Sequence, residues 1–265
     1  MAGGRGRPML IRSLLLLFGF LLGDCLALAA DTGYAAAINQ AGRQRMLTQR
    51  IVKTYCQIGL GVTPEASKAQ LKESVALFER QLAALKPTAT SKEMRDATAQ
   101  IDRLWGPFKS VATGPVHRAG AQQLMGSSEE LLRAADELTK LLEGQSGTAI
   151  GRLVNISGRQ RMVSQRLAKL YMLQAWGFDS PQLRSDMSAA AALFATALAE
   201  LQQAPQNTDA IRAQLEAVSI QWEWFRHALE LQGEESFRQL VADASESILR
   251  SLEMITALYQ ERGSN

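Results

Sequence analysis

Two arginines, Arg45 and Arg161, are the side chains of this sequence whose position could do chemistry. On a helical wheel at 100° per residue, Arg45 falls in a mostly apolar stripe, and Arg161 falls in a similar stripe of its own segment. A guanidinium on a packing face needs a partner, because an uncompensated buried charge costs several kcal/mol. No acid lies in residues 38–58 or 154–178. The partner is therefore either a carboxylate on another helix or a small anion that accepts from the planar guanidinium.

A glycine lies one helical turn before each arginine. Gly42 and Gly158 each cost a helix about 1 kcal/mol relative to alanine, but the missing side chain permits close approach by a ligand or a second helix. Spacing alone leaves two interpretations open. Either these glycines and arginines form an anion site, or the arginines pair with acids of neighbouring helices and the glycines merely allow tight packing. Four further arginines, which we take as secondary candidates, lie elsewhere in the two segments: Arg43, Arg50, Arg159 and Arg166.

The arginine motif belongs to an internal repeat. Residues 38–50 (INQAGRQRMLTQR) recur 116 positions later as residues 154–166 (VNISGRQRMVSQR). At an offset of 116 or 117 the match continues, pairing Lys53 with Lys169 and Trp105 with Trp222. The chain therefore contains two copies of one unit, at roughly 34–144 and 153–261.

Each copy reads as four helical segments, which position the arginine motif on the first. Apolar residues recur at three- and four-residue spacing, with few alternating patterns typical of strands. Thr63 and Ser180 each precede a proline and are predicted to cap the second segments. We therefore predict an all-α protein of two tandem four-helix bundles, with a first repeat at 31–146 and a second at 147–265. The stretch 144–147 is the expected joint, although the helix could also run on through it.

The first thirty residues have the pattern of a secretory signal peptide. A charged start is followed by the apolar run LLLLFGFLL at 14–22 and by small residues that end at Ala30. This run is shorter than the roughly 20 residues of a membrane span. We predict cleavage near Ala30 and export to the periplasm, and a retained signal anchor or a lipidated Cys25 are the alternatives.

The composition argues against several classes of protein. The formal net charge is +3, and three arginines lie in the predicted leader, so the remainder is nearly neutral and unsuited to nucleic acid. Cys25 and Cys56 allow one disulfide at most, and Cys56 aligns with Met172 as a packing position. His117 and His227 belong to no ligand cluster, so we expect no metal site. The sequence has no Gly-rich phosphate loop and no Ser/His/Asp arrangement, so we expect no cofactor and no enzyme activity. Five aromatic residues at helical spacing in equivalent segments are expected in the core: Trp105, Phe108, Trp222, Trp224 and Phe225.

The motif of residues 42–50 resembles a known signature. It is similar to the Gly-Arg-Gln-Arg-Met-Leu-Ser-Gln-Arg segment of the periplasmic domain of type IV pilus methyl-accepting chemotaxis transducers, apart from Thr48 in the first copy and Val163 in the second. More distantly it resembles the first helix of nitrate and nitrite sensor kinases, on the residues Gly42, Arg45, Met46 and Arg50.

The resemblance implies a ligand and a role. In such sensors the first helices of two subunits meet and hold an anion between arginines, which implies that Arg45 and Arg161 bind a small oxyanion, with nitrate or nitrite favoured, beside Gly42 and Gly158. No second membrane span or signalling region follows these copies in the sequence, so we expect an accessory to a membrane receptor or pilus component. If the copies stack end to end, a homodimer must build the paired site; if they lie side by side, one chain suffices. The alternative is a helical interaction scaffold without a small ligand.

Overall fold

The computed structural model is all-α over the residues it describes, whose backbone covers 9–231 and 235–263 and whose side chains cover 33–231 and 236–263. Eight α-helices and one short 3₁₀-helix, with no strand, make up this part of the chain, which confirms the predicted fold class of tandem helical bundles. The elements are α1 (Met9–Gly59), α2 (Pro64–Leu85), η1 (Lys86–Thr88), α3 (Lys92–Ala112), α4 (Arg118–Ser146), α5 (Ala149–Ala175), α6 (Pro181–Gln202), α7 (Asp209–Glu230) and α8 (Glu235–Arg262).

The turn between α4 and α5 lies at the joint expected from the sequence. Gly147 adopts a left-handed conformation with φ of 62°, which ends α4, and the side chain of Thr148 accepts a hydrogen bond from the backbone N–H of Gly151 to begin α5. The chain therefore turns here instead of continuing as one helix.

The two predicted caps at α2 and α6 differ. Ser180 is extended and accepts from the N–H of Leu183, as predicted. Thr63 has a left-handed backbone with φ of 39° and makes no capping bond, so that prediction is wrong. A capping hydroxyl reaches the first turn only from an extended backbone, which Thr63 does not adopt.

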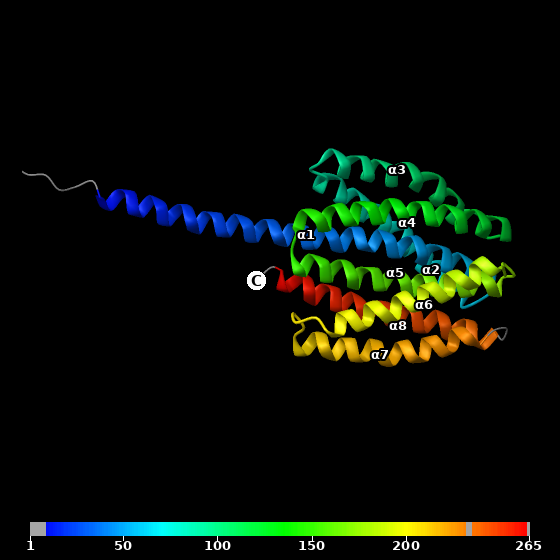
Figure 1. Cartoon of the computed structure of the whole chain (residues 1–265). Coiled ribbons are helices and arrows are strands. Elements are labelled where there is room, and N and C mark those ends of the chain that lie inside the picture. Colours follow the sequence, from blue (N-terminus) through cyan, green and yellow to red (C-terminus); the bar gives the residue numbers. More distant parts are fainter. Residues whose placement is uncertain (1–8, 232–234, 264–265) are drawn as a thin grey trace, which may run out of the picture.

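The two bundles lie side by side and meet through their motif helices. Helices α1 and α5 pack against each other in the middle of the molecule, with α4 beside α1 and α8 beside α5 (Figure 1). Helices α2 and α3 complete the first bundle, and α6 and α7 complete the second. One continuous apolar core includes Phe78 of the first copy and Phe194 of the second. Of the two arrangements considered from the sequence, the side-by-side one is observed.

Helix α1 extends past the end of the bundle at its N-terminal end (Figure 1). The predicted signal peptide, residues 1–30, lies outside the residues whose side chains are described, so its cleavage stays a prediction. Among the described residues, no helix has the length and apolar character needed to cross a membrane.

Two expectations about exposure are corrected by the packing. Asn39 and Thr54 are polar and fall outside the apolar stripe of α1, yet both are buried, because α2, α4, α5 and α8 all contact this helix. Trp224, expected in the core, is 74% exposed, whereas Trp222 is 5% exposed and stacks on Phe194 with ring centroids 4.4 Å apart. Two residues of an α-helix turn the side chain by about 200°, so the two indoles face opposite directions.

Candidate anion site at the crossing of α1 and α5

The helices α1 and α5 cross where the two motif glycines meet. A Cβ built on Gly42 would lie 3.7 Å from the Cα of Gly158, and one built on Gly158 would lie 3.8 Å from the Cα of Gly42. The missing side chains of the two glycines favour this close approach of the helix backbones. The sequence prediction that these glycines allow a close approach agrees with this geometry, and the element that approaches is the other copy's motif helix.

Both guanidinium groups lie at this crossing. The position of a Cβ on Gly42 would be 3.4 Å from Nη2 of Arg45 and 3.5 Å from Nη2 of Arg161. Both arginine side chains are fully buried. Two buried positive charges that face one point repel each other, so the site is suited to negative charge.

Both terminal nitrogens of the Arg45 guanidinium have hydrogen-bond acceptors. Its Nη1 donates to the carboxylate of Asp136 on α4 at 2.7 Å, and its Nη2 donates to Oδ1 of Asn155 on α5 at 2.7 Å. Only its Nε lacks a hydrogen-bond partner. The interpretation that an acid from a neighbouring helix answers the motif arginine therefore holds for Arg45.

Only one nitrogen of the Arg161 guanidinium has a hydrogen-bond acceptor among the described residues. Its Nη2 donates to Oδ1 of Asn39 on α1 at 2.8 Å, in a mirror of the Arg45 contact, but the nearest carboxylate, Glu253 on α8, lies 4.0 Å from Nη1. Both Nε and Nη1 of Arg161 are buried without a hydrogen-bond partner among the described residues. Such donors are costly to leave unsatisfied, so they point to an acceptor that the protein itself does not supply.

The pKa values of the two arginines express the same difference. Burial, together with the nearby charges of Arg43 and Arg45, lowers the pKa of Arg161 to about 9, although the charge of Glu253 opposes this shift. Burial also lowers the pKa of Arg45, but Asp136 raises it through both its charge and its hydrogen bond. An anion beside Arg161 would stabilise the charged form that burial disfavours.

Two asparagines of the motif belong to the site and were not among the predicted site residues. Asn39 and Asn155 occupy equivalent positions and each accepts from the arginine of the other copy. Their identity in both copies of the repeat was a signal that could have found them. On a helical wheel both asparagines fall outside the apolar stripe, and a single helix shows nothing of its neighbour in the other copy.

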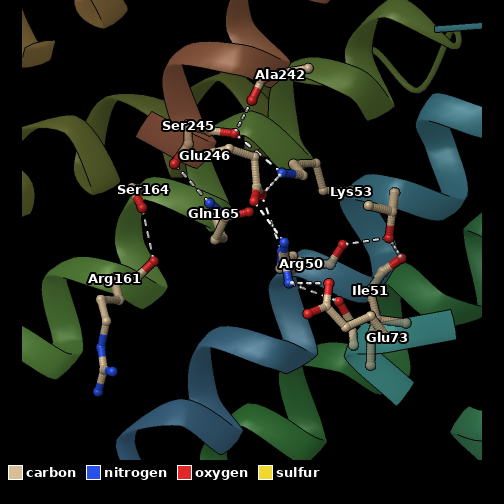
Figure 2. Close-up of polar contacts among 12 residues, drawn as sticks. Arg50, Ile51, Lys53, Glu73, Arg161, Ser164, Gln165, Ala242, Ser245 and Glu246 are labelled. Carbon is tan, nitrogen blue, oxygen red and sulfur yellow. Dashed lines mark hydrogen bonds and ion pairs between the residues drawn. The ribbon is translucent and has the colours of Figure 1, made fainter. Parts of the chain in front are cut away.

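The secondary candidates Arg50 and Arg166 lie away from the crossing, in two partly buried ion-pair clusters. Arg50 and Lys53 of α1 both bind Glu246 of α8, with the short contacts at 2.7 and 2.5 Å (Figure 2). In the same view the side chain of Arg161 extends away from Glu246. In the equivalent cluster, Arg166 and Lys169 of α5 bind Glu129 of α4, at 2.8 and 2.7 Å. Each motif helix is therefore tied to the fourth helix of the other copy.

The other two secondary candidates border the crossing from its solvent side. Nε of Arg43 lies 3.4 Å from Glu253 and its side chain is 30% exposed. Arg159 is partly buried; burial is the main cause that lowers the pKa of Arg45, and the charge of Arg159 lowers it too. Nε of Arg43 also lacks a hydrogen-bond partner, but it lies closer to the carboxylate of Glu253 than Arg161 does, and among the described residues only Arg161 has two such buried nitrogens.

The remaining candidates for chemistry have structural roles. His117 caps α4 by accepting from the N–H of Gly120, and His227 is exposed on α7. Cys56 is buried and free, and burial raises the pKa of its thiol to about 12. No group of His, Cys, Asp and Glu suited to a metal ion occurs among the described residues.

Comparison with protein families identifies a family model that matches both copies of the repeat. The model of PilJ, the type IV pili methyl-accepting chemotaxis transducer N-terminal family, matches residues 26–138 and again residues 145–247. The chain belongs to this family. The resemblance to the transducers is thereby confirmed, whereas the resemblance to nitrate and nitrite sensor kinases stays a prediction. Comparison with curated proteins and with solved structures gives no match.

Membership of the PilJ family makes the chain a chemotaxis sensing module. Domains of this family belong to membrane chemotaxis transducers and are typically periplasmic. The family is a sensory and not a catalytic one, while the absence of enzyme activity in this chain stays a prediction.

Proposed function

We propose that this PilJ-family module binds a small oxyanion between Arg45 and Arg161 and acts through a membrane partner. The observation that carries the proposal is the guanidinium of Arg161, fully buried with Nε and Nη1 unpaired. Nitrate and nitrite are the favoured ligands through the resemblance of the motif to the sensor kinases.

The alternative of purely structural ion pairs accounts for one arginine but not for the other. Asp136 neutralises Arg45 at 2.7 Å, whereas Glu253 stays 4.0 Å from Arg161 and lies closer to Arg43, at 3.4 Å. A guanidinium buried only to pack would be expected to have a closer acid, because the desolvation cost of an unpaired charge is several kcal/mol. An anion in the crossing offsets that cost.

A single chain is sufficient for the proposed site. The arrangement of α1 and α5 brings both motif arginines to one point within one molecule, so the homodimer considered from the sequence is not required for ligand binding. Because Glu246 and Glu129 tie each motif helix to the other copy's fourth helix, a change in the separation of α1 and α5 would move α4 and α8 as well. That movement is the proposed signal to the partner.

The proposal is tested by titrating the chain without residues 1–30 with nitrate, nitrite, chloride and sulfate, by calorimetry and by thermal shift. A ligand at 100 times its dissociation constant stabilises the folded state by about 2.7 kcal/mol. Arg161→Lys keeps the charge but loses the planar donors, so it is expected to weaken binding by roughly tenfold to a hundredfold. Arg43→Lys, at the partly exposed neighbour, is the matched control and is expected to bind almost normally. If no oxyanion binds at millimolar concentration, the anion-site proposal fails.

A second candidate function, docking of a protein partner, is favoured by a different observation. Among the described side chains, all large exposed apolar residues lie in the second copy: Leu193, Ile220, Trp224, Leu231, Leu240 and Met254. At an offset of 117, the residues equivalent to Ile220, Leu240 and Met254 are Arg103, Gln123 and Glu137. Copurification of a membrane transducer with the wild-type chain, lost in an Ile220→Gln, Trp224→Gln double variant, would support the interaction scaffold.

A further inference from the structure

The α1–α5 crossing has two halves, the groups around Arg45 and the groups around Arg161. These halves carry different charges, although the repeat gives them equivalent positions. Asp136 and Glu253 are equivalent at an offset of 117, yet only Asp136 binds its arginine directly, at 2.7 Å compared with 4.0 Å for Glu253. Glu253 is shared with Arg43. The shorter acid therefore makes the closer contact, and the longer one is held between two arginines.

A second pair of equivalent residues increases the difference. Glu143 of α4 accepts a hydrogen bond from the amide of Asn155, the residue that binds Arg45. Its equivalent on α8 is Gln260, which accepts from the amide of Asn39, the residue that binds Arg161, at 2.8 Å. The same hydrogen bond is thus made by a carboxylate in one half and by a neutral amide in the other.

The charged groups around each arginine follow from these contacts. Asp136 and Glu143 face Arg45, with Arg159 nearby and Lys140 bound to Asp136 on the solvent side, where Lys140 is 57% exposed. Arg161 is faced by Glu253 and by Arg43. Solvent screens the charge of an exposed lysine far more than that of a buried group, so the half around Arg161 holds the less compensated positive charge.

From this asymmetry we infer that the crossing binds a single monoanion on the unpaired N–H groups of Arg161, and that Asp136 and Glu143 act as specificity-determining residues that exclude dianions. This inference rests on the proposed oxyanion site and adds its charge class. The two carboxylates neutralise the Arg45 half, so about one uncompensated positive charge remains at the crossing, in the half around Arg161. A dianion would bring its second negative charge toward Asp136 and Glu143, and the repulsion of like charges in a buried site lowers affinity.

The test uses two exchange variants, each of which gives one copy the residue of the other, with nitrate as the monoanion and sulfate as the dianion. Calorimetric titration at constant ionic strength is expected to show that the wild-type chain binds nitrate at least tenfold more tightly than sulfate. Gln260→Glu adds a carboxylate behind Asn39 and is expected to weaken nitrate binding about tenfold. Glu143→Gln removes a carboxylate from the Arg45 half and is expected to raise the affinity for sulfate relative to nitrate severalfold.

The outcomes separate this inference from the proposed function. Absence of binding by both anions to the wild-type chain overturns the oxyanion site itself. Binding of sulfate as tightly as nitrate, or unchanged nitrate affinity in a folded Gln260→Glu variant, overturns the monoanion inference while the site stands. Glu143 and Gln260 are only partly buried, and circular dichroism checks that both variants fold. If one of the variants does not fold, the ratio of nitrate to sulfate affinity in the wild-type chain still tests the monoanion inference.

Discussion

The two copies of the repeat agree in their outer ion-pair clusters and differ at their crossing. Glu246 and Glu129 are equivalent residues, and each binds an arginine and a lysine of the opposite motif helix at 2.5 to 2.8 Å. At the crossing, by contrast, Arg45 has a close carboxylate and Arg161 has none. A nearly symmetric frame therefore holds a site whose two halves are unequal, and the inequality arises from single residues on α4 and α8.

The clusters themselves are not quite equal, and this difference predicts the largest effect of an ion-pair substitution on stability. The Glu246 side chain is 15% exposed, compared with 33% for Glu129, whereas the lysines of both clusters, Lys53 and Lys169, are buried. Glu246→Gln leaves two buried cations without their acid, which typically costs about 3 to 5 kcal/mol of unfolding free energy. Glu129→Gln is expected to cost less. Urea unfolding of both variants tests this order, and an equal loss would show that the clusters are equivalent.

Acid pH provides a second test of the Glu246 cluster. Burial by itself raises the pKa of Glu246, but the charges of Lys53 and Arg50 outweigh it and lower the pKa to about 2, from an ordinary value of 4.5. A carboxylate with a depressed pKa stabilises the folded state above its unfolded pKa, and this contribution is lost as the pH falls toward 2. The stability gap between the wild type and Glu246→Gln is therefore expected to narrow between about pH 5 and pH 2. Urea midpoints measured across this range would contradict the prediction if the gap stayed constant.

A methyl group at the crossing is expected to separate binding from stability. Gly42→Ala places a Cβ at ordinary contact distances of 3.4 to 3.7 Å, so the fold is expected to tolerate it. The same methyl group contacts Nη2 of both arginines, so it is expected to shift the guanidinium groups that hold the proposed anion and to lower anion affinity at least tenfold. Gly126→Ala on α4, where a Cβ meets nothing within 4 Å, is the matched control. It is expected to gain up to about 1 kcal/mol of stability from helix propensity, with unchanged binding.

The smallest effect is expected at the exposed apolar surface of the second copy. Trp224→Gln removes a side chain that is 74% exposed, so the unfolding free energy is expected to change by less than about 0.5 kcal/mol. Trp222→Ala, two residues earlier, removes a buried ring stacked on Phe194 and is expected to cost about 3 to 5 kcal/mol. Thermal unfolding distinguishes the two, and a large loss for Trp224→Gln would mean that this indole packs within the molecule.

The sequence by itself determined the helical fold, the duplication and the importance of the arginine motif. Apolar periodicity specifies helices because each helix must bury one stripe, and this requirement can be read from one segment alone. The burial of Arg45 and Arg161 followed from the same reasoning, since both arginines fall in such a stripe.

Only the tertiary structure decided what those arginines meet. Whether the copies stack or lie side by side depends on contacts between residues more than a hundred positions apart, which no local pattern encodes. The pairing of Arg45 with Asn155, and of Arg161 with Asn39, exists because α1 and α5 cross at Gly42 and Gly158. The exposure of Trp224 likewise depends on which side of α7 the second bundle covers. A helical wheel assigns faces to one helix, but only the packing of the other helices decides which faces are buried.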